Sequence, residues 1–231
     1  DNNVIASRNL VNSMLDNDVK NILYVSTASI YPKTVQGRVS EKRTPVPKTP
    51  YAKTKFITEQ LINDYKVYGL KSTILRLFNV AGAHGFNDLD IGKNVITVLL
   101  NLIKDNRLFT LMGNDYPTPD GTCVKDFIHV DDVTEAIGKS AAKLLEPDTA
   151  SQTYNLGTGK GTSLGELIRK SIDITGKELK LRIGAALEDE VPSLIANNTK
   201  IKKDLGWAPQ KNIDEIITSC WKWILQNGGK R

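Results

Sequence analysis

Short apolar runs alternate with longer helical patterns in the first part of the chain, and this alternation constrains the fold most. Residues 21–26 and 72–78 have the composition of buried strands, and residues 50–68 form a helical pattern with one apolar side. Gly69 follows the helix, where a left-handed residue often ends one. Strands that alternate with helices are typical of a parallel sheet covered by helices. We therefore expect an α/β fold with a doubly wound parallel sheet.

The remaining chain predicts further helices but no internal repeat. Helical patterns cover residues 1–15, 94–104, 130–145, 163–174 and 213–226. Ser163 and Glu166 have the spacing of a capping box at the start of one of them. The first helix has no Gly-rich phosphate loop before it, so we expect the 231 residues to be a fragment that lacks the start of a nucleotide-binding sheet.

Composition excludes several classes of partner. The net charge is +5, but the basic residues are scattered among acidic ones, so no nucleic-acid partner is predicted. No apolar run approaches the ~20 residues that cross a membrane. The two cysteines, Cys123 and Cys220, are too few for a disulfide framework. We therefore expect a cytoplasmic protein without a membrane partner.

Tyr51 and Lys55 form the first candidate for chemistry. Four residues apart on the predicted helix, they share one face. A phenol with its ordinary pKa of about 10 is a poor base, but a nearby ammonium favours its ionised form. Strand 21–26 runs into Thr27, at the end of a parallel strand where ligands bind. The alternatives are a surface pair without chemistry and a threonine that caps a turn.

Two other patterns suggest sites that we decline. Residues 157–161 are Gly-rich and precede a helix, yet the third glycine of a dinucleotide fingerprint is displaced, so a structural loop is expected. His129 with Asp131 and Asp132 suggests a metal cluster, but the two acids point to different helix faces and His84 is distant in sequence. No zinc spacing exists, so no metal site is predicted.

The order of strand, Thr27 and Tyr51-x-x-x-Lys55 resembles the extended short-chain dehydrogenase/reductase superfamily. Residues 75–83 and, above all, 113–132 resemble the UDP-glucose 4-epimerase family within it. The resemblance implies the carboxyl-terminal part of a Rossmann-like sheet plus a smaller α/β substrate-binding region. Residues 1–80 would be the rest of the NAD-binding domain, without its Gly-rich loop. Residues 81–231 would mainly bind substrate, with some segments returning to the sheet.

The resemblance also implies an activity, a cofactor and roles for single residues. The family interconverts UDP-glucose and UDP-galactose through a 4-keto sugar with tightly bound NAD, and a homodimer is compatible with it. Thr27 would bridge the tyrosine and the sugar, Tyr51 would move the hydroxyl proton, and Lys55 would hold the nicotinamide ribose. The other residues that match family positions for cofactor are Asn3 and Phe78, and those for the UDP-sugar are Asn79, Asn94, Thr110, Met112, Lys125 and Glu190.

Several departures from the family pattern concern the substrate. Lys125 and Leu187 stand where arginines usually grip the diphosphate, and a lysine does not reproduce the fork of an arginine. Glu190 replaces an aspartate, Leu194 a tyrosine and Met112 a large aromatic residue, and residues 84–92 form a shortened loop. We therefore expect weak or altered binding of the UDP-sugar.

Three alternatives stay open. A different nucleotide-sugar epimerase is one, and a sugar 4,6-dehydratase is another, although that class has an Asp-Glu pair after the threonine, where this chain has Ala28 and Ser29. A non-catalytic remnant is the third. Without the Gly-rich loop we expect the 231 residues alone to bind NAD poorly and to be inactive.

Overall fold

Three parallel strands form the central sheet of the protein. The computed structural model describes residues 3–32, 37–85, 94–187 and 190–227. Strand β3 (Lys71–Leu77) lies between β1 (Asn21–Thr27) and β8 (Gln152–Leu156). The strand β8 therefore returns from the second half of the chain to pair with β3.

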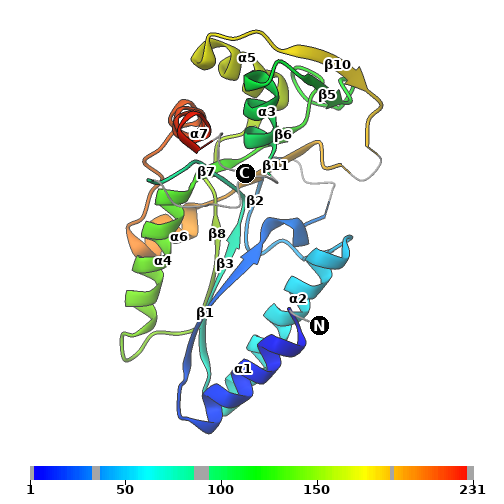
Figure 1. The fold of residues 1–231 in the computed structure, drawn as a ribbon. Helices are drawn as coiled ribbons and strands as arrows, with labels where there is room; N and C mark the ends of the chain where they lie inside the picture. The colour runs from blue at the N-terminus through cyan, green and yellow to red at the C-terminus, as the bar shows by residue number, and fades with distance from the viewer. Residues whose placement is uncertain (1–2, 33–36, 86–93, 188–189, 228–231) are drawn as a thin grey trace.

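Helices cover both faces of this sheet (Figure 1). On one face lie α1 (Ile5–Asp16) and α2 (Pro50–Asp64), and on the other lie α4 (Val130–Leu144) and α6 (Thr199–Leu205). Each face has its own apolar core, because alternate side chains of a strand point to opposite sides. The predicted doubly wound α/β fold is confirmed.

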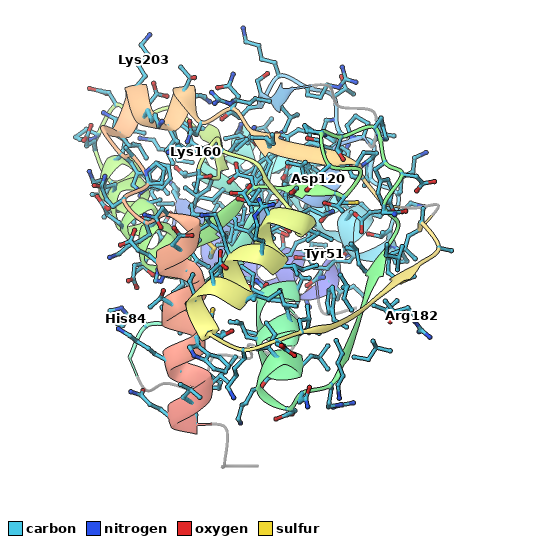
Figure 2. All side chains as sticks on the ribbon, turned by 90° about the horizontal axis from the view of Figure 1, so that it is seen from above. Tyr51, His84, Asp120, Lys160, Arg182 and Lys203 are labelled. Carbon is cyan, nitrogen blue, oxygen red and sulfur yellow. The ribbon has the colours of Figure 1, made fainter. Side chains whose placement is uncertain are left out.

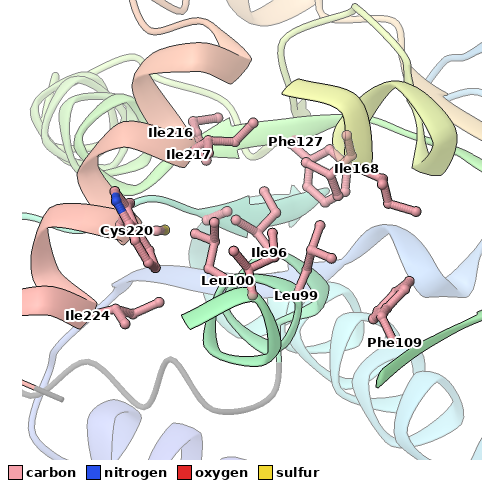
Figure 3. Close-up of a cluster of buried hydrophobic side chains, with 14 of the residues drawn as sticks. Ile96, Leu99, Leu100, Phe109, Phe127, Ile168, Ile216, Ile217, Cys220 and Ile224 are labelled. Carbon is pink, nitrogen blue, oxygen red and sulfur yellow. The ribbon is translucent and has the colours of Figure 1, made fainter. Parts of the chain in front are cut away.

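A second group of elements lies beyond the carboxyl ends of the central strands (Figure 1). The largest apolar cluster joins three helices there, as Figure 3 shows. These helices are α3 (Val95–Lys104), α5 (Leu164–Thr175) and α7 (Ile213–Asn227). The short strands are β2 (Arg38–Val39), β4 (Asn79–Ala81), β5 (Leu108–Met112), β6 (Val124–Lys125), β7 (Phe127–His129), β9 (Thr162–Ser163), β10 (Lys180–Gly184) and β11 (Ser193–Ala196). No helix in the described ranges is long and apolar enough to cross a membrane.

The predicted helix ends follow local chemistry. The pattern over 50–68 divides into α2 and a 3-10 turn, η2 (Tyr65–Tyr68), and Gly69 ends it with φ 87°. Ser163 caps α5 by accepting a hydrogen bond from the Glu166 backbone N–H at 3.0 Å. Helix α6, which ends at Gly206 with φ 57°, was not predicted, because its two turns are too short for a periodic pattern.

Gly82 makes room for a close contact between the short strands β4 and β7. Strand β4 pairs with β7, opposing Ala81 to His129, and Gly82 follows with φ 90°. A Cβ on Gly82 would lie 2.4 Å from Cδ2 of the buried His129 ring. Gly85 also has a left-handed backbone, with φ 64°, but no atom would lie within 4 Å of its Cβ. Gly82 and Gly85 therefore share a left-handed backbone, but only Gly82 is closely packed. Comparing substitutions at the two positions isolates the effect of the packing.

We expect Gly82→Ala to destabilise the protein more than Gly85→Ala. Both changes incur the left-handed backbone cost of roughly 1–2 kcal/mol. Only Gly82→Ala also forces the His129 ring to move, which adds about 1–3 kcal/mol. Urea unfolding of both variants measures the difference, and equal losses in the free energy of unfolding would contradict the close packing.

Candidate active site

Thr27 ends β1 at the carboxyl edge of the central sheet. Its side chain is buried, and its Oγ1 accepts a hydrogen bond from the Ser29 backbone N–H at 3.2 Å. The hydroxyl also donates to Ser29 Oγ at 3.1 Å. Thr27 thereby caps the 3-10 turn η1 (Ala28–Ile30), which packs against α2. Thr27 therefore caps a turn, and its hydroxyl also lies at the edge of the sheet.

Helix α2 carries the Tyr51 and Lys55 pair. Thr49 caps the helix by accepting from the Ala52 backbone N–H at 3.1 Å, so Tyr51 lies in its first turn. The Tyr51 side chain is open to solvent, with 53% of the residue exposed. One turn on, Lys55 Nζ donates to the Val25 carbonyl at 2.9 Å and lies 5.1 Å from the Tyr24 ring centroid. Burial lowers the pKa of Lys55.

A buried ion pair that sequence reasoning missed fixes the same helix to the sheet. Arg76 of β3 donates from Nη2 to Glu59 Oε2 at 2.7 Å and from Nε to both carboxylate oxygens at 3.1 and 3.2 Å. Its Nη1 donates to the Tyr31 hydroxyl at 2.9 Å, which donates to Asn155 Oδ1 at 2.7 Å. The available signal was an arginine next to the apolar residues Ile74, Leu75 and Leu77 in a strand predicted to be buried, because buried charges need partners.

Asn3 and Phe78, the two remaining candidates for cofactor binding, lie beside this part of α2. Asn3 donates from Nδ2 to Thr54 Oγ1 at 3.1 Å. Phe78 is buried in a cluster with Ala28 and Ala52. Because those alanines follow Thr27 and Tyr51 in sequence, the structure brings the candidate catalytic and cofactor residues to one edge of the sheet.

The candidate asparagines of the substrate set flank β4. Asn79 begins the strand and donates from Nδ2 to the Asp126 carbonyl at 3.2 Å. Asn94 caps α3, accepting from the Ile96 backbone N–H at 2.9 Å, and its Nδ2 donates to the Val80 carbonyl. Both amides therefore hold backbone groups of the fold.

Thr110 and Met112 lie on β5, which pairs with β10. Thr110 Oγ1 accepts from Arg182 Nη2 at 3.3 Å, and Met112 opposes Gly184. After β5, the ring of Tyr116 packs under Gly113, and its hydroxyl accepts from the Leu187 backbone N–H at 3.0 Å. The end of β5 thus lies beside the segment that carries Leu187.

Lys125 and Glu190 form an ion pair. Glu190 Oε1 also accepts from the Val191 backbone N–H at 3.0 Å, so the carboxylate is held in place. Leu187 is 46% exposed. The Lys125 ammonium, which we expected to contact a diphosphate, is therefore already paired with the Glu190 carboxylate. The expected shortening of loop 84–92 concerns mainly residues 86–92, which lie outside the described residues.

The Gly-rich loop 157–161 is tied to a buried carboxylate. Asp126 accepts from the backbone N–H groups of Thr158, Gly159 and Ala196 at 2.8, 2.9 and 3.0 Å, and from Thr158 Oγ1 at 2.6 Å. These backbone donors are occupied by the protein itself. The interpretation of this segment as a structural loop, without phosphate binding, agrees with this geometry.

Both histidines contact Asp131, although His84 is distant from it in sequence. His84 Nδ1 lies 2.7 Å from Asp131 Oδ1, and His129 Nδ1 accepts from the Asp131 backbone N–H at 3.0 Å. Asp132 points elsewhere and accepts from the Lys211 backbone N–H at 3.1 Å. No metal-binding group of three ligands exists in the described ranges. Figure 2 shows His84 at the periphery beside α7, apart from Tyr51.

Comparison with known sequences finds relatives that belong to one family. Residues 1–157 match the NAD dependent epimerase/dehydratase family. The chain is 35% identical over 229 residues to a UDP-glucose 4-epimerase of Rhizobium leguminosarum bv. trifolii, covering 96% of this chain and 70% of that protein. It is 36% identical over 231 residues to a UDP-glucose 4-epimerase of Rhizobium meliloti, with the same coverage.

Solved structures agree with these relatives. The UDP-glucose 4-epimerase of Brucella ovis in complex with NAD has a TM-score of 0.90 at 29% identity, covering 96% of this chain and 70% of that one. The enzyme of Bifidobacterium longum in complex with NAD+ and UDP has a TM-score of 0.88 at 27% identity, covering 100% and 71%. The Rossmann-like fold is therefore confirmed.

We expect Asp126→Asn to destabilise the protein by at least about 2 kcal/mol, since hydrogen bonds to a charged group contribute roughly 1.5–3 kcal/mol. An amide has only one acceptor oxygen, so in either orientation its NH2 group faces at least one of the backbone donors of Thr158, Gly159 and Ala196. Asp148→Asn, at an exposed position, is the matched control. Urea unfolding measures both, and similar free energies of unfolding would show that the carboxylate does not hold the loop.

Proposed function

The chain belongs to the NAD dependent epimerase/dehydratase family and to its UDP-glucose 4-epimerases, and we propose that it interconverts UDP-glucose and UDP-galactose. It is an NAD-dependent nucleotide-sugar epimerase by family. The observation that carries the proposal is the attachment of α2 to β1. Lys55 donates to Val25, so the Tyr51 and Lys55 pair is held at the sheet edge where Thr27 ends the strand.

The residues at this edge fit the ribose end of a dinucleotide. Lys55 uses one N–H on the Val25 carbonyl, and an ammonium has three donors, so others can meet ribose hydroxyls. Ser26 Oγ is buried in the same strand and has no hydrogen-bond partner within the described residues. We propose that Asn3, Thr27, Tyr51, Lys55 and Phe78 line the NAD site. Bound NAD supplies a reversible hydride acceptor for the sugar.

The protein's own groups move the proton and orient the sugar. Tyr51 accepts the proton of the sugar 4-hydroxyl, and Lys55 provides a positive charge that stabilises the phenolate oxygen. The Thr27 hydroxyl, held by its contact with Ser29, bridges the tyrosine and the sugar. Inversion requires the 4-keto sugar to turn so that its other face meets the cofactor. Tyr51 then returns the proton to the same sugar oxygen, so one tyrosine serves as base and then as acid.

The UDP-sugar would lie between the two groups of elements. We propose that Asn79, Asn94, Thr110, Met112, Lys125 and Glu190 contact it. On this assignment residues 1–80 belong to the NAD-binding part and residues 81–231 mainly to the substrate-binding part, with β8 returned to the sheet. We further propose a cytoplasmic homodimer. Exposed apolar residues on α1 and α2, Ile5, Leu10 and Ile57, support the homodimer.

The ion pair of Lys125 with Glu190 supports a second candidate function. Because a carboxylate already neutralises Lys125 and Leu187 has no charge, the chain could belong to a protein that binds UDP-sugars weakly without turning them over. The two experiments below separate this alternative from an epimerase.

Tyr51→Phe tests the assignment of the acid-base group. A chimera in which residues 1–231 replace the matching 70% of the Rhizobium meliloti relative provides the assay protein. In it, Tyr51→Phe should retain NAD but lower the turnover of UDP-galactose by ~10²–10⁴-fold, the usual contribution of a general acid-base group. Tyr68→Phe, at an exposed position off α2, is the control. Turnover within about twofold of the parent would exclude Tyr51 as the base.

Leu187→Arg tests whether this position faces the diphosphate. In the same chimera, Leu187→Arg should lower the Michaelis constant for the UDP-sugar about tenfold or more, since a charge-assisted hydrogen bond to phosphate contributes roughly 1.5–3 kcal/mol. Turnover should change little, as for an interaction made equally in ground and transition states. Lys125→Arg should act more mildly, because a charge is already present. An unchanged or raised Michaelis constant in Leu187→Arg would show that this position does not face the diphosphate.

A further inference from the structure

Lys55 has two neighbours at helical spacing that could attract its ammonium. Tyr51 lies one turn before it and Glu59 one turn after it on α2. Side chains four residues apart on a helix are neighbours, and opposite charges at this spacing attract each other. A free Glu59 carboxylate would therefore draw the Lys55 ammonium away from Tyr51.

Arg76 removes that competition. Its Nε and Nη2 together contact both carboxylate oxygens of Glu59, and both residues are buried, with 7% of Arg76 and 1% of Glu59 exposed. The guanidinium cannot easily turn away, because Nη1 donates to the Tyr31 hydroxyl at 2.9 Å. The fork of an arginine can satisfy a carboxylate in this way, whereas a lysine cannot.

The ammonium of Lys55 is directed elsewhere as a result. It donates to the Val25 carbonyl at 2.9 Å and lies over the Tyr24 ring. No ion pair joins Lys55 to Glu59 within the described residues. Glu59 therefore serves α2 as an anchor on β3 rather than as a counter-ion on the helix surface.

We propose that Arg76 is a positioning residue, which occupies the Glu59 carboxylate and so keeps the Lys55 ammonium at the end of β1, on the side of Tyr51. The inference rests on the proposed function in one respect, since it takes Tyr51 and Lys55 to be the acid-base pair. Arg76 itself touches neither the substrate nor the cofactor in this assignment. Its effect passes through Glu59 and then through the side chain of Lys55.

The test is the rate at which acetic anhydride acetylates Lys55, measured against pH by mass spectrometry on the 231-residue chain. Only the neutral amine reacts, so the pH profile reports the pKa of this lysine. Lys53, exposed on the same helix, is the internal reference. In Arg76→Met the freed Glu59 should pair with Lys55 and raise its pKa by about one unit or more. The acetylation rate below that pKa should then fall about tenfold.

Matched variants separate positioning from stability. Glu59→Gln also breaks the buried ion pair, and each single change should lower the urea midpoint because it leaves one buried group unpaired. Only Arg76→Met should slow the acetylation of Lys55, since Glu59→Gln leaves no competing carboxylate. The double variant Glu59→Gln/Arg76→Met should return the rate to within about twofold of the parent. If Arg76→Met does not fold, Arg76→Gln has the same expected effect.

Equal slowing in both single variants, or no slowing in either, would overturn the proposal and leave Arg76 a purely structural role. A double variant that stays as slow as Arg76→Met would overturn it as well. The acetylation needs neither NAD nor a sugar, so its outcome is independent of whether Tyr51→Phe abolishes turnover. Failure of the positioning role and failure of the proposed function are therefore distinguishable.

Discussion

The buried ion pair between Arg76 and Glu59 determines how α2 lies on the central sheet, and the candidate active site depends on that placement. A buried ion pair stabilises a fold only when its geometry is good and further hydrogen bonds satisfy the remaining donors. Here the guanidinium meets both carboxylate oxygens and also the Tyr31 hydroxyl, which in turn contacts Asn155 on β8. One network thus joins α2 to β3, η1 and β8. Lys55 adds a second attachment, one turn nearer to Tyr51.

Asp126 has the corresponding role beyond the carboxyl ends of the central strands. Its carboxylate gathers backbone donors from loop 157–159 and from β11, and its carbonyl receives the side chain of Asn79. The segment before it carries Lys125, whose ion pair with Glu190 occupies the position where the family resemblance places a diphosphate contact. The candidate catalytic residues Thr27, Tyr51 and Lys55 therefore match the family pattern, whereas Lys125 and Leu187 depart from it.

Much of the fold could be predicted because its signals are local. The strands near 21–26 and 72–78, the caps at Ser163 and Gly69, and the side-by-side placement of Tyr51 and Lys55 all follow from patterns within a few residues. The pairing of β5 with β10 and the short helix α6 could not be predicted in this way. Their partners lie far away along the chain, and their own patterns are too short to carry a period.

The sequence by itself determined the longer helices, the strands near 21–26 and 72–78, the α/β class and the family to which the chain belongs. Only the tertiary structure decided which charges meet. Arg76 and Glu59 are 17 residues apart, His84 and Asp131 are 47 apart, and Lys125 and Glu190 are 65 apart. No local pattern encodes these contacts, because they arise when strands and helices from distant segments pack and bury their polar groups together. A buried charge then has to take whichever partner the packing provides.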